Sequence, residues 1–399
     1  MVIVTQGMPA TNRVQARSSS RSPVETGPAP VPGGHGRQPI RVALAGPSLD
    51  ILGGQAVQLD RLRRRLESTP GVEVGFIPMN PRLPGPLRQL QRIKYLRTIV
   101  TSIAYGLKLL REVPSYDVIQ AFSPSYWAFL LGPVPAMAVA RLYRRKVILN
   151  YHSGEAADHL ATWRMAIPLA RLASCIVVPS GYLAEVFARF GLQAEVVHNF
   201  VETESIPFRV RSVARPLFLS NRNLEPMYNV ACSIRAFGRI QAAVPDARLT
   251  VAGFGSERFR LEELVKQLGI ANVRFAGRVP PDEMGRLLDE ADILLNSPDI
   301  DNMPLSLIEA QAAGLPIVST RTGGIPWIVS HGETGLLADP GDDAGLAAAA
   351  LRLLKEPGLS RSISEAARAS CLGSFTWASV GAHWVRTYRA LVEPAAVSA

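Results

Sequence analysis

Two successive series of short apolar runs, in which amphipathic stretches separate one run from the next, constrain the fold of this 399-residue chain more than any other feature. This alternation is typical of βαβ units, whose parallel strands are covered by helices on both faces. The length also exceeds what one hydrophobic core usually serves. We therefore predict an α/β fold with two doubly wound domains. The expected strands are 40–46, 72–77, 118–122, 146–151, 175–179 and 196–198 in the first series, and 216–220, 248–252, 273–276, 293–296, 316–319 and 335–337 in the second.

The polar stretch 202–215, which has no regular period, predicts the connection between the two domains. We expect a first domain at 40–205, a second at 206–373 and a terminal helix at 374–393. Residues 1–39 are rich in Ser, Pro, Gly and Arg and lack a hydrophobic signal core, so we interpret them as a disordered tail. The three cysteines have no partners at metal-ligand spacing, and a cytoplasmic location fits them best.

One segment of the chain is strongly basic. The formal net charge is +10, and residues 82–111 contain no acid and seven basic side chains: Arg82, Arg88, Arg92, Lys94, Arg97, Lys108 and Arg111. Aliphatic residues lie between them at regular spacing. This pattern suits either a basic amphipathic helix at the anionic inner surface of a membrane or a core-facing helix with a solvated basic face.

A membrane-spanning helix and a nucleic-acid-binding surface both fit the sequence less well. The most apolar run, 127–140, is too short to span a membrane and contains two prolines, so we interpret it as a buried helix. The chain has no recognisable base-reading module, and aliphatic rather than aromatic residues lie among its basic side chains. We therefore expect no nucleic-acid partner.

Ligands of open parallel sheets bind beyond the carboxyl ends of the strands, so the loops after the predicted strands are the candidate site. Gly53 and Gly54 follow the first strand and begin a helix. Paired glycines there let backbone N–H groups approach a phosphate, although they also suit a plain tight turn.

The stretch 292–319 is predicted to form a strand, an acidic loop, a helix and another strand. A proline suits the first turn of that helix and Gly314 its end. Asp301 then lies in the loop and Glu309 within the helix, where carboxylates and the helix dipole can hold the hydroxyls and phosphates of a nucleotide diphosphate. A solvated helix face is the alternative interpretation for the glutamate. The helix start expected to face the ligand comprises Asn302, Met303, Pro304 and Leu305.

The spacing of these two acids resembles the acid-x7-Glu signature of the retaining glycosyltransferases of family 4, with Asp301 as the first acid and Glu309 as the second. Further segments resemble motifs of that family in its order: 197–202, the Gly-x-Gly turn within 251–256, the base-contacting 273–279, the Gly-Gly-x-Pro loop at 322–326 and the terminal helix at 375–388. The resemblance extends from residue 40 to about residue 391. It implies the GT-B fold, in which two Rossmann-like domains face a cleft and the last helix crosses back to the first domain.

The resemblance also implies roles for the matching residues. Glu309 would hold the donor ribose and Asp301 the donor sugar, and His152 would lie near the transferred sugar. Arg222 would bind the diphosphate. The remaining donor-binding residues would be Gly53 and Gly54 at the diphosphate, Gly253 and Gly255 in the turn, and Arg278 and Val279 at the base.

Two departures from the family pattern affect the site. A lysine usually follows the diphosphate arginine by five or six residues, but Met227, Tyr228 and Asn229 stand there. Loss of such a charge can cost several kcal/mol of transition-state stabilisation, so either another cation replaces it or catalysis is impaired. The candidate replacements are Arg278 and Arg321. Trp327 also replaces the glutamate that follows the Gly-Gly-x-Pro loop in the family.

The resemblance implies a retaining enzyme in which the donor phosphate accepts the acceptor's proton. The donor would be a nucleotide sugar and the acceptor a glycan or a lipid-linked molecule, with no metal or other cofactor. Two alternatives stay open. Asp299 and Asp301 form an Asp-x-Asp that could bind a divalent ion, and the missing lysine would also suit a catalytically silent nucleotide-sugar-binding protein.

Overall fold

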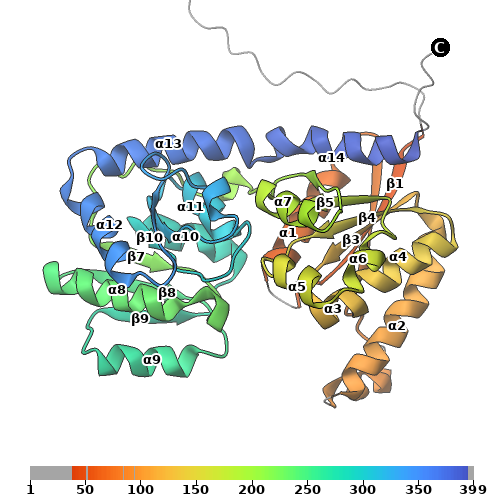
Figure 1. The fold of residues 1–399 in the computed structure, drawn as a ribbon, viewed down its shortest axis with the longest axis horizontal. Helices are drawn as coiled ribbons and strands as arrows, with labels where there is room; N and C mark the ends of the chain where they lie inside the picture. The colour runs from red at the N-terminus through yellow and green to blue at the C-terminus, as the bar shows by residue number, and fades with distance from the viewer. Residues whose placement is uncertain (1–37, 51–52, 84, 94, 394–399) are drawn as a thin grey trace, which may run out of the picture. The chain divides into compact units, whose positions relative to one another are not determined.

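Two six-stranded parallel sheets form the framework of the computed structural model, which describes residues 38–50, 53–83, 85–93 and 95–393 (Figure 1). The first sheet has the order β2-β1-β3-β4-β5-β6 and the second β12-β11-β10-β7-β8-β9. The prediction of two doubly wound sheets is confirmed, with small shifts at the strand ends. The first sheet contains β1 (Ile40–Gly46), β2 (Val72–Pro78), β3 (Val118–Ser123), β4 (Lys146–Tyr151), β5 (Cys175–Val178) and β6 (Glu195–Val196). The second contains β7 (Leu217–Ser220), β8 (Arg248–Ala252), β9 (Val273–Gly277), β10 (Ile293–Leu295), β11 (Ile317–Thr320) and β12 (Leu336–Ala338). The predicted tail at 1–39 falls almost entirely outside the described residues.

Helices cover both faces of the first sheet because alternate strand residues point to opposite faces. Val42 and Leu44 of β1 belong to the core under α1 (Gly54–Glu67) and α14 (Trp377–Val392), whereas Ala43 and Ala45 belong to the core of the other face. The helices that pack on that other face are α2 (Leu96–Glu112), α3 (Tyr126–Leu131), α4 (Pro133–Leu142), α5 (Ala156–Thr162), α6 (Ala166–Ala170) and α7 (Gly181–Arg189).

The second sheet is covered in the same way. Phe218 of β7 packs with the core on one face and Leu219 with the core on the other. The first of these cores includes residues of α8 (Val230–Ala243), α9 (Arg258–Gln267) and α12 (Asp343–Lys355). The second includes residues of α10 (Pro281–Glu290), α11 (Leu305–Ala312) and α13 (Leu359–Ser374).

The chain crosses between the two halves twice. After β6, the stretch 202–215 packs against the second half: the buried Arg211 donates to the carbonyl of Leu288 at 2.7 Å, and Arg215 Nε lies 2.8 Å from the buried Asp292. On the return, α13 packs against α11 of the second half and α14 against β1 and β3 of the first. A β-bridge between Val201 and Thr376 places the two crossings side by side.

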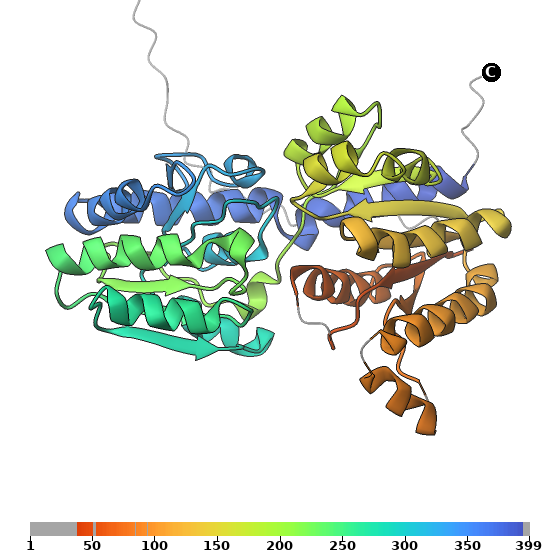
Figure 2. The ribbon, with the colours of Figure 1, turned by 60° about the horizontal axis from the view of Figure 1, so that its bottom comes forward.

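Two helix predictions are wrong in detail. The run 127–140 is not one buried helix, because Gly132 separates α3 from α4 and the side chain of Trp127 is 67% exposed. The segment 82–111 is not one helix either, since a 3-10 helix, η1 (Gly85–Arg92), precedes α2 (Figure 2, orange). Among the helices of the described residues, none is long and apolar enough to cross a membrane.

Candidate active site

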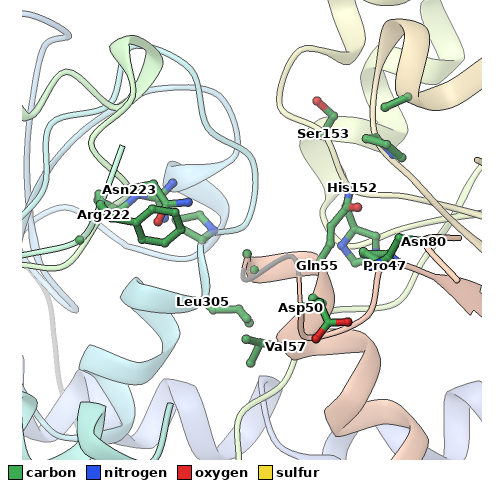
Figure 3. A pocket seen from close by; sticks show the side chains of 18 of the residues that line it. Pro47, Asp50, Gln55, Val57, Asn80, His152, Ser153, Arg222, Asn223 and Leu305 are labelled. Atoms are coloured by element: carbon green, nitrogen blue, oxygen red, sulfur yellow. The ribbon is translucent and has the colours of Figure 1, made fainter. Parts of the chain in front are cut away.

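One cavity of about 1200 Å³ is lined by the loops that follow strands of both sheets (Figure 3). Because parallel strands end at the same edge of a sheet, the loops after them converge there. Figure 3 shows His152 and Gln55 on one side and Arg222 and Asn223 on the other. The predicted site residues that line this cavity are Gly53, Gly54, His152, Arg222, Gly253, Arg278, Val279, Asp301, Met303, Pro304, Leu305 and Glu309.

Arg222 lies on the second-half side of the cavity and pairs with Asp301. Its Nη2 is 2.6 Å from Asp301 Oδ2, and its Nη1 donates to Ser306 Oγ at 3.2 Å. The Nε atom is buried and has no hydrogen-bond partner among the described residues. Burial raises the pKa of Asp301, and the neighbouring Arg222 guanidinium opposes that rise.

Tyr228 lies near the position of the missing lysine and supports Arg222. The guanidinium carbon of Arg222 is 4.1 Å from the centre of the Tyr228 ring, which is the geometry of a cation–π contact. Tyr228 belongs to the short 3-10 helix η4 (Pro226–Tyr228), which precedes α8. Tyr228 therefore puts an aromatic ring where the family usually has a lysine, and this ring orients Arg222, the remaining cation of the pair.

Glu309 is held by an arginine from the opposite half. Arg61 of α1 places its Nη2 2.7 Å from Glu309 Oε1, and the two side chains are 9% and 13% exposed. In the described part of the chain, Oε2 accepts no hydrogen bond. The pair therefore fixes the carboxylate and leaves one oxygen for a ligand hydroxyl.

His152 follows β4 and stacks on Phe122, with ring centroids 5.3 Å apart and an interplanar angle of 13°. Its Nε2 is buried without a hydrogen-bond partner in the described residues. Burial lowers the pKa of His152 to about 4, so the ring is neutral near pH 7. A neutral imidazole in the cavity wall can hydrogen-bond a hydroxyl of a ligand.

The glycines predicted at the site bring backbone close to the cavity. Gly53 is the N-cap of α1, and no side chain caps this helix start or adds an acid to its first turn. Gly253 leaves no room for a side chain, because a Cβ there would lie 2.0 Å from the carbonyl oxygen of Arg222. Gly255 is not among the lining residues; its added Cβ would meet the carbonyl of Leu224 at 2.3 Å.

Asn302 and Arg321 do not line the cavity. Asn302 is buried, where its Oδ1 accepts a hydrogen bond from Ser180 and its Nδ2 lies 3.4 Å from the carbonyl oxygen of His152. It therefore joins the loops of the two halves. Arg321 pairs with Asp339 at 2.9 Å, so of the two replacement cations only Arg278 reaches the cavity.

The two carboxylates of the Asp-x-Asp alternative have separate partners. Asp299 Oδ1 accepts a hydrogen bond from Asn229 at 3.0 Å, whereas Asp301 pairs with Arg222. Trp327, in the place of the family's glutamate, lies outside the cavity lining and packs on Gly181.

Two parts of the site were not predicted. Arg61 is one: it is buried on the cavity side of α1, but its partner is 248 residues away in the sequence. The sequence feature that could have indicated a buried role for Arg61 is its place beside the apolar face of an amphipathic helix. The other is a polar lobe in the first half, formed by Asn80, Arg82, Gln91, Arg97, Thr98, Thr101 and Ser102.

The comparisons with known proteins agree with this architecture. The family model described as Glycosyl transferases group 1 matches residues 202–370, and the one described as Glycosyltransferase Family 4 matches residues 52–205. The chain therefore belongs to the family 4, group 1 glycosyltransferases and has their GT-B fold.

Three proteins illustrate the similarity. The N-acetyl-alpha-D-glucosaminyl L-malate synthase of Bacillus anthracis is 36% identical over 165 residues, which are 41% of this chain and 42% of the relative. A Mycobacterium tuberculosis glycogen synthase is 28% identical over 273 residues, or 64% of this chain and 66% of the relative. Each match thus spans less than two thirds of that relative's length. The crystal structure of Anabaena HepE with UDP-glucose has a TM-score of 0.70 at 18% identity, and the match covers 87% of this chain and 99% of HepE.

Proposed function

We propose that this protein transfers a hexosyl group from a nucleotide diphosphate sugar to a glycan or lipid-linked acceptor, with retention of configuration and without a metal ion or other cofactor. The observation that carries the proposal is one cavity lined both by His152 and Gly53 of one half and by Arg222, Asp301 and Glu309 of the other. Family membership and the UDP-glucose bound to HepE support a nucleotide-sugar donor.

Each side chain then has a defined task. Arg222 and the N–H groups at the start of α1 bind the diphosphate, and the free oxygen of Glu309 binds the ribose. Asp301 and His152 bind hydroxyls of the donor sugar. Arg278, which also lines the cavity, compensates in part for the missing lysine.

The reaction needs no nucleophilic side chain. The bond between the anomeric carbon and the phosphate oxygen breaks, and the acceptor oxygen bonds to the same face of that carbon. A donor phosphate oxygen takes the acceptor's proton. The protein contributes position and fixed positive charge that stabilises the leaving diphosphate.

The metal-free part of the proposal rests on the pairing of the acidic loop with protein groups. Asp301 forms an ion pair with Arg222, and Asp299 accepts a hydrogen bond from Asn229. We place the acceptor in the polar lobe of the first half and the reaction in the cytoplasm, at the inner face of the membrane.

A thermal-shift screen of UDP- and GDP-sugars tests donor binding, because a ligand that binds only the folded state raises its stability. The expected result is a higher melting temperature with one class of donor, followed by slow hydrolysis of that donor and by transfer to sugar acceptors. NMR of the product reports the anomeric configuration. Binding without hydrolysis or transfer would instead identify a nucleotide-sugar-binding protein.

A further inference from the structure

Helix α2 presents a row of exposed aliphatic side chains. Ile99, Ile103, Leu107 and Leu110 are 58%, 59%, 63% and 41% exposed. Their spacing of four, four and three residues places them on one face of the helix. Isolated exposed aliphatics are common on soluble proteins, but a continuous row along a helix marks an interaction surface. We call these four residues the α2 stripe.

The opposite face of the same helix lines the cavity in its first two turns. Arg97, Thr98, Thr101 and Ser102 belong to the cavity wall. Further along that same face α2 is buried, where Tyr105 donates to the carbonyl of Gly132 at 3.2 Å and the helix packs beside α4. A molecule that contacts the α2 stripe is therefore separated from the polar lobe by the width of this helix.

The charge around the α2 stripe is predominantly positive. Between residues 82 and 111 the sequence has seven Lys or Arg and no acid. Arg88 and Arg92 of η1 and Arg111 at the end of α2 are exposed, and none forms an ion pair with another described residue. Lys108 differs, because it pairs with Glu112 at 3.2 Å.

This combination favours one occupant. A second copy of the chain would bring two strongly basic surfaces together, and such like-charge contact opposes association. An anionic bilayer instead satisfies both features, because its headgroups attract the arginines while its acyl boundary accepts the aliphatic row.

We propose that the α2 stripe and the arginines beside it dock on an anionic membrane, and that the acceptor is a lipid-anchored molecule that enters the polar lobe from this membrane past Arg97. The inference about the acceptor rests on the proposed function. The inference about membrane docking does not, so an experiment can refute either one without refuting the other.

Vesicle sedimentation tests the docking, with phosphatidylcholine vesicles compared with vesicles that also contain phosphatidylserine. Wild type should sediment only with the anionic vesicles, and less at high salt. Each basic residue removed should lower the partition coefficient about five-fold, so Arg88→Gln/Arg92→Gln/Arg111→Gln should lower it roughly a hundred-fold. Ile103→Gln/Leu107→Gln should abolish the part of binding that resists high salt.

A matched control is available at α9 of the second half. Phe259 in this helix and Leu268, its C-cap residue, are 75% and 48% exposed, so Phe259→Gln/Leu268→Gln should bind vesicles like wild type. Equal donor-induced thermal shifts in all variants would show that the donor site is intact. The proposal would be overturned if wild type failed to sediment with anionic vesicles at low salt. It would also be overturned if Phe259→Gln/Leu268→Gln lost as much vesicle binding as Ile103→Gln/Leu107→Gln. A dimer in vesicle-free light scattering that Ile103→Gln/Leu107→Gln dissociates would assign the stripe to self-association instead.

Discussion

Arg61 of α1 and Glu309 of α11 form a buried ion pair, 2.7 Å between Nη2 and Oε1, that joins the two halves of the molecule across the donor side of the cavity. A buried pair fixes geometry more than it adds stability, because desolvation offsets most of the attraction. Its importance here is that one partner is the carboxylate proposed to bind ribose. Closure of the halves and donor binding therefore depend on the same two side chains.

Replacing Arg61 tests this coupling. Arg61→Met should cost about 3 kcal/mol of unfolding free energy, because it leaves a buried carboxylate without its partner. It should also raise KM for the donor more than it lowers kcat, and Arg61→Lys should restore part of both. Denaturant unfolding and initial-rate kinetics measure these effects. Arg63→Met on the same helix is the control, since its contacts with Asp60 and Glu67 lie at the surface. If Arg61→Met and Arg63→Met had the same stability and the same KM for the donor, the Arg61–Glu309 pair would have no role in donor binding.

Substitutions at Glu309 separate its binding role from its structural role. We expect Glu309→Gln, which keeps a hydrogen-bond acceptor for Arg61, to fold normally and to lose roughly a hundred-fold or more in transfer rate. Glu309→Ala should lose transfer as well and should unfold more easily, because Arg61 would then be buried without its partner. Circular dichroism confirms folding before the rates are compared. A folded Glu309→Gln enzyme with wild-type activity would contradict the assignment of this residue.

The stack of Arg222 on Tyr228 predicts an order of effects. Arg222→Ala should lower kcat more than Tyr228→Ala, because it removes the diphosphate cation itself. Tyr228→Phe should stay close to wild type, since the ring that supports the guanidinium is kept. Tyr228→Lys would restore a second charge and should raise turnover. Transfer rates at saturating donor decide the order, and equal small losses for Arg222→Ala and Tyr228→Ala would place diphosphate binding elsewhere.

Chelation tests the acidic loop. Because Asp299 and Asp301 are each paired with a protein group, we expect transfer to be unchanged in excess EDTA. The measurement is the transfer rate before and after dialysis against chelator, followed by addition of Mg²⁺ or Mn²⁺. Activity that falls with EDTA and returns with either ion would support the Asp-x-Asp alternative.

Two histidines predict how stability changes with pH. Burial lowers the pKa of His152 and of His159 from 6.5 to about 4, although Asp158 opposes the shift at His159. Below about pH 6.5 the unfolded chain binds a proton at each position, whereas the folded chain does not until about pH 4. Their contribution is therefore complete above pH 6.5 and decreases as the pH falls toward 4, by about 1.4 kcal/mol per histidine and pH unit.

Urea unfolding at a series of pH values checks this slope. His159→Gln should reduce the slope by about half, because one of the two groups no longer titrates. A slope that is the same in wild type and His159→Gln would show that other groups govern acid stability.

The strands could be predicted because each one corresponds to a short apolar run of the sequence with turn residues on both sides. The same holds for Asp301 and Glu309, whose relation depends on the spacing within one loop and helix. The break between η1 and α2 was not predicted, since the aliphatic spacing of 82–111 continues through it. Trp127 was predicted to be buried from hydropathy alone, but it lies in the first turn of α3 with its side chain at the surface.

The sequence by itself determined the two-sheet fold, the loops that carry the site and the absence of the usual lysine, because periodicity and spacing are properties of neighbouring residues. Only the tertiary structure decided which side chains act together. Arg61 meets Glu309 across 248 residues of chain, the Tyr228 ring lies beneath Arg222, and one helix presents both the α2 stripe and a wall of the cavity. Such relations depend on how the sheets and their loops are placed in space, and the periodicity and spacing of neighbouring residues do not predict that placement.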